Sequence, residues 1–392
     1  MIMKSSIYMD AHATTPVDPR VLEEMLPYFT EKFGNAASRN HAFGWEAEEA
    51  VDEAREKVAA AIGAEAKEII WTSGATESDN LALIGAAEMA PAGKDHLIVS
   101  TIEHKAILDC AASLERRGFR VSFALVDSTG LVDLEKLAAL LDAKTFLVSI
   151  MTANNEVGTI EPIAEIARLV HDRSPALFHT DAVQAMGNLE MSVREAGIDL
   201  LSLSGHKVYG PKGVGALFVR RRPLVRLAPL LHGGGHERGM RSGTLNVPAI
   251  VGMGKALQIA MQELDLHRRH AATLRDRLRE EIFSQLDGVF LNGHPRLRLP
   301  NNLHLSFARV EAEDLLREIP HIAVSTGAAC SSASVEPSHV ITALGLGQER
   351  AQSSIRFGIT RFNTPQEVDV VVEGVVQGVR KLRALAVQPE AP

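Results

Sequence analysis

The sequence predicts an α/β fold: a large lobe with a mostly parallel, seven-stranded sheet flanked by helices, and a smaller α+β lobe. Short apolar runs are typical of buried strands, and seven of them occur between residues 68 and 219. Segments with apolar residues at helical spacing separate most of these runs, which indicates crossover units around a parallel sheet. A chain of 392 residues is also long enough to bury two cores.

The expected elements follow in order along the chain. The first helix is marked by apolar residues at helical spacing: Val51, Ala54, Val58 and Ile62. Gly63 then ends it. The expected strands of the large lobe are 68–72, 96–101, 119–126, 145–150, 176–179, 199–204 and 216–219. A long helical segment at about 247–286 leads to a second module, with strands near 303–307 and 354–359.

These elements divide the chain into two expected domains. The large one spans residues 16–262, and the small one comprises residues 1–15 and 263–392. The small domain should carry a mobile loop at about 325–335, because the residues there are small and polar. No internal repeat or low-complexity linker interrupts this organisation.

Composition excludes several classes of protein. The formal net charge of −8 argues against a general nucleic-acid binder, which would carry a strong basic excess. Two cysteines cannot form a disulfide framework and favour a reducing compartment. The first residues lack the apolar run of a signal peptide, and no stretch approaches the ~18 uninterrupted apolar residues of a membrane span. We therefore expect a cytoplasmic protein that binds neither nucleic acid nor membrane.

Four motifs place chemically useful residues where strands end. The turn "LSGHKVYGPKG" carries Lys207, and "HTDAVQ" ends a buried strand with Asp181. The segment "TSGATESDN" runs from a strand into a helix, with Thr76 and Asp79 spaced as a capping box. The segment "IEHKA" puts His104 just past another strand. In an α/β fold these side chains meet at one edge of the sheet.

Together the four motifs match the needs of pyridoxal phosphate. A lysine must form an imine with the aldehyde, and a carboxylate must keep the pyridine nitrogen protonated. A helix start offers backbone N–H groups to the phosphate, and a flat side chain can cover the ring. Each motif alone also has a simpler interpretation: a solvated lysine, a strand-end cap, or a hydrogen-bonded histidine. Their joint order along the chain favours the cofactor.

Longer motifs extend this pattern into a family resemblance. They are "ATTPVDPR", "FGNAASR", "SGATESDN", "NNEVG", "SGHKVYGPKG", "HGGGHERGMRSGT" and "SSIRFG". From Tyr8 to about Leu385 the chain resembles the cysteine desulfurases of the NifS/IscS-like group, in the class-V aminotransferase family. The resemblance implies pyridoxal-phosphate fold type I and removal of sulfur from L-cysteine. The products are L-alanine and an enzyme-bound persulfide, whose sulfur serves iron–sulfur cluster assembly and other sulfur transfer.

The resemblance also implies roles for residues at matching positions. Lys207 forms the imine, Asp181 pairs with the pyridinium, and His104 stacks on the ring. Asn155 and Gln184 bond near the 3′ oxygen. The phosphate contacts implied are Ala75, Thr76, Ser204, His206 and, in the neighbouring subunit's site, Thr244. A homodimer with shared sites follows from this last contact. The substrate contacts implied are Arg356, which clamps the carboxylate, together with Asn35 and Asn155.

The segment "STGAACSS" surrounds Cys330 with small residues that cannot pack a core. The resemblance implies that the Cys330 thiolate attacks the substrate sulfur and then carries it as a persulfide to an acceptor protein. Such delivery needs a loop that can move between the cavity and an acceptor. Whether Cys330 also ligates a transient iron–sulfur cluster is left open. Cys110, inside a helical pattern, is instead expected to pack in a core.

Some features and alternatives stay open. A selenocysteine lyase or an aminotransferase could share this fold, and a non-enzymatic sulfur relay is a third candidate. The basic cluster Arg220, Arg221, Arg222 and Arg226 is either a solvated face or, as in the family, a surface for acidic partner proteins. The end "AVQPEAP" is short compared with relatives that dock an iron–sulfur scaffold protein. His12 stands where relatives often have other residues, and the sequence assigns it no role. His232 and His236 are expected to belong to loop geometry.

Overall fold

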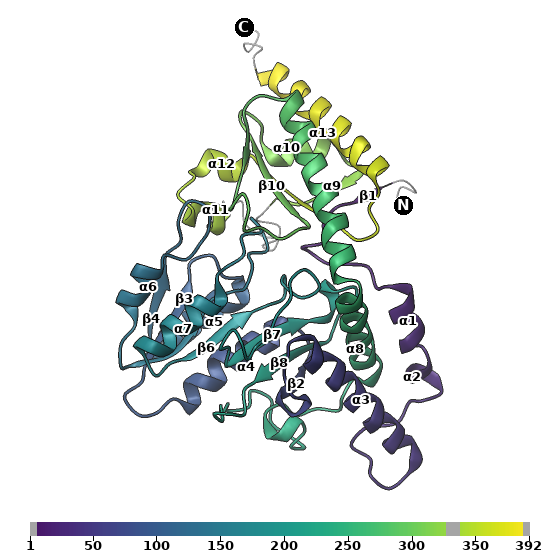
Figure 1. Ribbon diagram of the computed structural model, residues 1–392, viewed down its shortest axis with the longest axis vertical. Coiled ribbons are helices and arrows are strands. Elements are labelled where there is room, and N and C mark those ends of the chain that lie inside the picture. Colours follow the sequence, from purple (N-terminus) through teal and green to yellow (C-terminus); the bar gives the residue numbers. More distant parts are fainter. Residues whose placement is uncertain (1–5, 327–337, 387–392) are drawn as a thin grey trace.

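All seven predicted strands of the large lobe are present in one sheet of the computed structural model, which describes residues 6–326 and 338–386 (Figure 1). In spatial order they are β2 (Ile69–Thr72), β8 (Gly215–Val219), β7 (Leu200–Ser204), β6 (Leu177–Asp181), β5 (Thr145–Ser149), β3 (His96–Ser100) and β4 (Arg120–Ala124). Only β8 runs antiparallel to its neighbours, β2 and β7. The prediction of a mostly parallel seven-stranded sheet is therefore confirmed.

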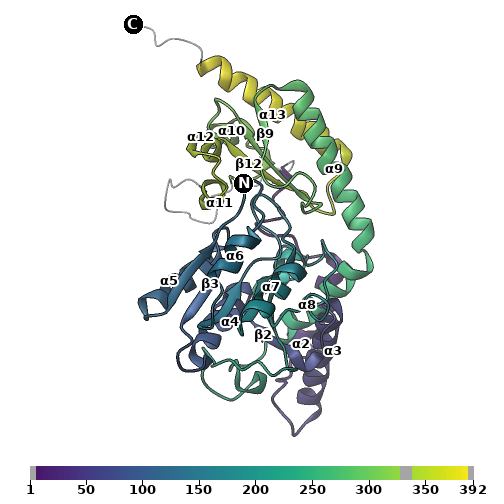
Figure 2. The same cartoon turned by 60° about the vertical axis from the view of Figure 1, so that its left-hand side comes forward.

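Helices cover both faces of this sheet (Figures 1 and 2). The helices of the large lobe are α1 (Pro19–Met25), α2 (Pro27–Thr30), α3 (Ala42–Ala61), α4 (Ala75–Met89), α5 (Lys105–Arg116), α6 (Leu134–Leu140), α7 (Ile163–Arg173) and α8 (Val247–Gln262). Three short 3-10 turns lie between them: η1 (Ala66–Glu68), η2 (Gly205–Lys207) and η3 (Glu237–Gly239).

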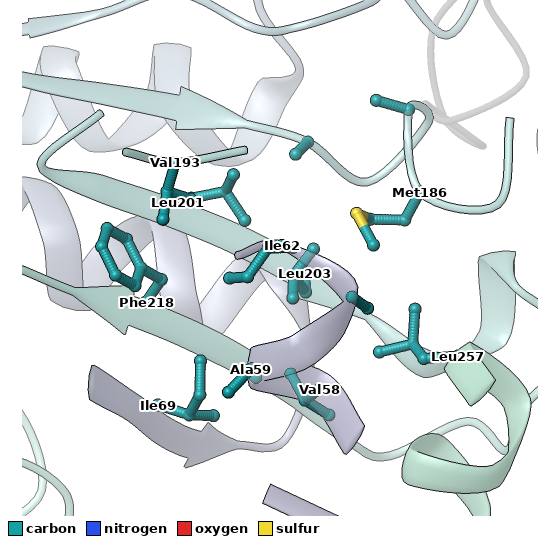
Figure 3. Packing of buried hydrophobic residues seen from close by; sticks show 14 of the residues in the cluster. Val58, Ala59, Ile62, Ile69, Met186, Val193, Leu201, Leu203, Phe218 and Leu257 are labelled. Atoms are coloured by element: carbon teal, nitrogen blue, oxygen red, sulfur yellow. The ribbon is translucent and has the colours of Figure 1, made fainter. Parts of the chain in front are cut away.

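The strands send alternate side chains to two different cores, as the period of two in a strand requires. Trp71 and Phe218 enter the core on the side of α3 and α8. Ile70 and Leu217, each one position away, enter the core on the side of α4 and α5. In the first core, side chains of α3 pack onto the sheet beside Leu257 of α8 (Figure 3). Both sheet faces are buried, which explains why the strand sequences are nearly continuous apolar runs.

The small lobe has its own sheet and core. Strands β12 (Ser354–Gly358), β10 (Asn302–Phe307) and β9 (Val289–Leu291) form an antiparallel sheet. The N-terminal strand β1 (Ile7–Tyr8) pairs with β11 (Ile322–Ala323), so the start of the chain lies in this lobe. Its helices are α9 (Leu264–Gln285), α10 (Ala312–Glu318), α11 (His339–Ala343), α12 (Gln348–Gln352) and α13 (Pro365–Ala386).

The long helical segment expected at about 247–286 is two helices. α8 ends at Gln262, and Glu263 leaves helical geometry with φ −104° and ψ 10° before α9 begins. The Glu263 carboxylate pairs with Arg20, with its Oε1 2.6 Å from Nη1. A separate apolar core lies on each side of this break, and we propose that the two domains divide here. No helix in the described part of the chain has the length and apolar character needed to cross a membrane.

Candidate active site

A cavity of about 460 Å³ opens at the edge of the large sheet where β6 and β7 end. Nine of the residues predicted to bind a cofactor line it together: Ala75, Thr76, His104, Asn155, Asp181, Gln184, Ser204, His206 and Lys207. They come from the last residues of five different strands or from the loops and helix starts that follow them. The parallel topology brings them together, because parallel strands present their carboxyl ends at one edge.

Lys207 reaches the cavity from the 3-10 turn η2, directly after β7. Its ammonium group donates hydrogen bonds to the backbone oxygens of His12 and Ala13, the latter at 2.8 Å. His12 and Ala13 belong to the N-terminal segment that follows β1. The amine is therefore held in place by backbone groups, at the wall of a cavity rather than on a solvated surface.

Asp181 is the last residue of β6 and is only 6% exposed. Its Oδ1 accepts a hydrogen bond from the Val183 amide at 2.9 Å. Burial raises the pKa of this carboxyl, while His104 and Lys207 oppose the rise. A carboxylate under a desolvation penalty is stabilised by any cation that binds beside it.

His104 caps the start of α5: its Nδ1 accepts a hydrogen bond from the Ala106 amide at 3.1 Å. That bond requires an unprotonated Nδ1, so a neutral ring carries its proton on Nε2. Burial lowers the pKa of His104, which favours the neutral ring. The cap also fixes where the flat imidazole stands at the cavity wall.

The start of α4 presents backbone amides without side-chain caps, although its N-cap differs from the prediction. The N-cap is Gly74, with φ +156°, and the first bond into the helix joins the Ser78 amide to the Gly74 oxygen at 3.1 Å. The amides of residues 75–77 precede that bond and face no intrahelical acceptor. A Cβ on Gly215 of β8 would come 2.6 Å from the Gly74 Cα, so the close approach of strand and turn requires glycine there.

The capping box of Thr76 and Asp79 was a wrong prediction. The Glu77 carboxylate instead bonds to the turn before the helix, since its Oε2 accepts from the Ser73 amide at 2.7 Å. Asp79 points inward, is 1% exposed, and neither of its oxygens has a hydrogen-bond partner among the described residues. Burial and the nearby Asp181 raise the pKa of Asp79. No local pattern could have shown this, because the inward direction of Asp79 depends on how α4 packs on the sheet.

Gln184 and Asn155 connect the cavity to two buried residues. The Gln184 amide bonds to His12 through both of its polar atoms. The backbone oxygen of Asn155 accepts from Arg356 Nη1 at 3.0 Å. Arg356 is 2% exposed and also pairs with Asp10, its Nη2 lying 2.9 Å from Oδ1. The guanidinium thus stands behind Asn155 rather than in the cavity lining.

Three predicted site residues among those that the structure describes do not line this cavity: Arg356, Thr244 and Asn35. Thr244 and Asn35 are exposed and lie outside its lining, and the Asn35 Oδ1 accepts from the Ala37 amide at 2.9 Å. Cys330 lies outside the described residues, as does most of the loop expected at 325–335. The lining residues that the sequence analysis did not single out include Lys212, Gly213 and Met151. Their residue types carry no signal that separates them from ordinary turn and core positions.

Two further predictions concern sulfur and metal ligands. Cys110 is buried in the core beside α4 and α5, and burial raises the pKa of its thiol to about 12, so core packing is confirmed. The described ranges contain no group of three or more His, Cys, Asp or Glu side chains that could hold a metal ion. His236 accepts a bond from the Gly243 amide at 3.3 Å within its own loop.

Comparison with known proteins agrees with this site. The family described as aminotransferase class-V matches residues 7–371. A cysteine desulfurase IscS of Anaeromyxobacter sp. (strain Fw109-5) is 56% identical over 384 residues, which cover 98% of this chain and 95% of that protein. The solved structure of a NifS-like protein is 41% identical, with a TM-score of 0.90 over 96% of this chain and all of that one. SspA in complex with cysteine is 36% identical, with a TM-score of 0.80 over 92% and 100% of the two chains.

The chain therefore belongs to the class-V aminotransferase family, in its NifS/IscS-like group of cysteine desulfurases. Enzymes of this group generally depend on pyridoxal phosphate.

Proposed function

We propose that this protein is a pyridoxal-phosphate-dependent cysteine desulfurase that converts L-cysteine to L-alanine and stores the sulfur as a persulfide on Cys330. The observation that carries the proposal is the meeting of Lys207, Asp181 and the start of α4 around one cavity. An amine, a buried carboxylate and an anion site are the three groups that this cofactor needs at its aldehyde, ring nitrogen and phosphate. Relatives named cysteine desulfurase support the choice of substrate.

The residues present fit the cofactor. The amides at the start of α4 and the side chains of Ser204 and His206 surround an opening suited to the phosphate. Burial lowers the pKa of His206 to about 4, so its ring is neutral and can donate one N–H. The pyridinium would add a cation beside buried Asp181, where Lys207 already opposes the rise in pKa. When bound, pyridoxal phosphate provides an aldehyde that captures amines and a ring that accepts electrons.

The remaining chemistry belongs to side chains of this protein. Lys207 is the amine that anchors the cofactor, and once displaced by substrate it can carry a proton between neighbouring atoms. Arg356, which already donates to the Asn155 oxygen, is the cation assigned to the substrate carboxylate. Asn35 and Asn155 are the amides assigned beside it.

Sulfur transfer needs a soft nucleophile, and Cys330 is the residue assigned to it. Its thiolate forms a bond to the substrate sulfur while the bond between that sulfur and the β-carbon breaks. The electron pair stays with carbon, which later takes up a proton and leaves as alanine. The persulfide sulfur then passes to an acceptor thiol, such as one on an iron–sulfur scaffold protein. A cytoplasmic location accords with this role.

A homodimer with shared sites is part of the proposal. Thr244, assigned to the neighbouring subunit's phosphate, is exposed and outside the cavity of its own subunit. Exposed aromatic side chains on α2, at the start of α3 and between them support an association surface: Phe29, Phe33, Phe43 and Trp45, with exposed fractions of 59%, 63%, 52% and 56%. The rings of Phe33 and Phe43 lie 5.4 Å apart. Exposed aromatic clusters of this kind mark association surfaces.

One assay tests the activity. Purified protein reconstituted with pyridoxal phosphate is incubated with L-cysteine and a reductant, and alanine and sulfide are measured together. We expect equal amounts of the two products. Consumption of L-cysteine with neither alanine nor sulfide would contradict the proposal and favour an aminotransferase, and turnover of selenocysteine alone would favour a selenocysteine lyase.

A further inference from the structure

His12 joins the N-terminal segment to two residues of the cavity. The residue lines the cavity and is 2% exposed. Its backbone oxygen accepts hydrogen bonds from Lys207 Nζ and from Gln184 Nε2, the latter at 3.1 Å. Its ring Nδ1 lies 2.8 Å from Gln184 Oε1. One residue thus contacts the amine of the site and both polar atoms of the amide beside it.

These contacts determine which nitrogen of the neutral His12 ring carries the proton. The backbone oxygen of His12 can only accept, so the amide atom facing it must be the nitrogen of Gln184. The other amide atom is then the oxygen, which can only accept from Nδ1. The proton of the neutral ring therefore sits on Nδ1. Exchanging the two amide atoms of Gln184 would place its oxygen against the His12 backbone oxygen and lose the bond between them.

The ring is also held neutral. Burial lowers the pKa of His12 to about 3, and the nearby cations Arg356 and Lys207 act in the same direction. The Nε2 atom has no hydrogen-bond partner among the described residues. His12 therefore acts through one N–H donor and its backbone oxygen, not through a change in charge.

The Gln184 amide has one hydrogen left for a ligand. An amide nitrogen carries two hydrogens, and one of them is directed to the His12 oxygen. Gln184 itself lines the cavity. A side-chain amide has free rotation about its last bonds, so holding it in one orientation requires partners at both atoms, and His12 supplies both.

We propose that His12 is a positioning residue: its neutral ring fixes the Gln184 amide so that the second N–H is held toward an oxygen of the bound cofactor. This inference rests on the proposed function, since it takes the ligand to be pyridoxal phosphate. The phenolate of that cofactor is the oxygen such a donor suits, because a charged acceptor makes the stronger hydrogen bond.

The test uses the pH titration of the visible absorbance of the full-length protein loaded with pyridoxal phosphate. The titrating proton is shared between the lysine-bound nitrogen and the phenolate oxygen. A hydrogen bond donated to that oxygen weakens its hold on the proton. His12→Ala should therefore raise the midpoint by about 0.5 to 1 pH unit, and weaken cofactor binding.

Two matched variants separate positioning from general damage. His12→Asn places an N–H near the position of Nδ1 and should restore the wild-type midpoint. His12→Gln places its N–H nearer the position of Nε2 and should behave like His12→Ala. In a Gln184→Leu background, which lacks the amide, His12→Ala should cause no further shift. The comparison of Asn with Gln remains informative even if the alanine variant folds poorly.

The possible outcomes distinguish a failure of the His12 inference from a failure of the proposed function on which it rests. A wild-type protein that gains no visible band from pyridoxal phosphate overturns the proposed function and this inference together. A normal wild-type band with an unshifted midpoint in both His12→Ala and His12→Gln overturns the inference alone. An equal shift from His12→Ala with or without the Gln184 amide also overturns it, because the effect would not pass through Gln184.

Discussion

Replacing Glu161 with glutamine should change how the stability of this protein depends on pH. Glu161 is 4% exposed, its Oε2 accepts from the Val132 amide at 3.1 Å, and its Oε1 has no partner among the described residues. Burial, with a smaller effect from Asp127, raises the pKa of this carboxyl from 4.5 to about 8. The folded protein thus holds a proton that the unfolded chain releases.

The sign and size follow from this difference. Because the folded-state pKa is raised, the stabilisation is complete below about pH 4.5 and is lost as pH rises through about 8. At about 1.36 kcal/mol per pH unit, the loss for this group between pH 5 and pH 9 is about 4 kcal/mol. With an unfolding entropy of about 2.1 cal/mol/K per residue, that corresponds to about 5 °C in melting temperature.

Glu161→Gln removes this titration while keeping a carbonyl oxygen for Val132. The assay is thermal unfolding of both proteins from pH 5 to pH 9. We expect the variant to gain about 5 °C relative to the wild type across that range. The difference in melting temperature between variant and wild type cancels the contributions of other titrating groups. One such group is Glu156, whose pKa burial raises to about 7. Glu165→Gln, an exposed position on α7, is the control. A constant difference between variant and wild type at all pH values would refute the reasoning.

Three further predictions test the site and the assembly. Lys207→Ala should lose the visible band of bound pyridoxal phosphate and all turnover; a persistent band at the same wavelength would contradict the assignment. Cys330→Ala should keep the cofactor content and hold the melting temperature within about 2 °C, because the change removes a single side-chain heavy atom. Its alanine production should fall at least 100-fold, since no other soft nucleophile replaces the thiolate; near-normal release of alanine and sulfide would exclude the thiol-attack mechanism. Phe33→Asp should shift the protein from dimer to monomer in sedimentation. An unchanged dimer would show that Phe33 does not lie in the dimer interface.

The sequence was sufficient for those features that depend on near neighbours in the chain. Each strand of the large sheet could be predicted from a short apolar run, because a strand buried on both faces needs apolar residues at consecutive positions. Lys207, Asp181 and His104 could be predicted as a set because each lies at the end of a strand or within four residues of it, and parallel strands end at one edge. The family motifs then suggested which ligand such a set would hold.

Only the tertiary structure decided features that depend on distant segments. Thr76 and Asp79 have capping-box spacing, yet the packing of α4 on the sheet buries Asp79 without a hydrogen-bond partner among the described residues. Helical periodicity continues through Glu263, yet the backbone leaves the helix where its carboxylate meets Arg20. Neither the burial of Asp79 nor the helix break at Glu263 can be predicted from residues within one or two helical turns of it.

The difference between local patterns and contacts of distant segments also applies within the active site. Strand periodicity and strand-end position are local, so the sequence by itself determined the sheet and the line of residues along its edge. His12 and Gln184 are 172 positions apart, and Asp10 and Arg356 are 346 apart. No pattern spans such separations, because those contacts exist only once the N-terminal segment folds back between the two lobes. The orientation of the Gln184 amide and the pairing of Arg356 therefore came from the fold alone.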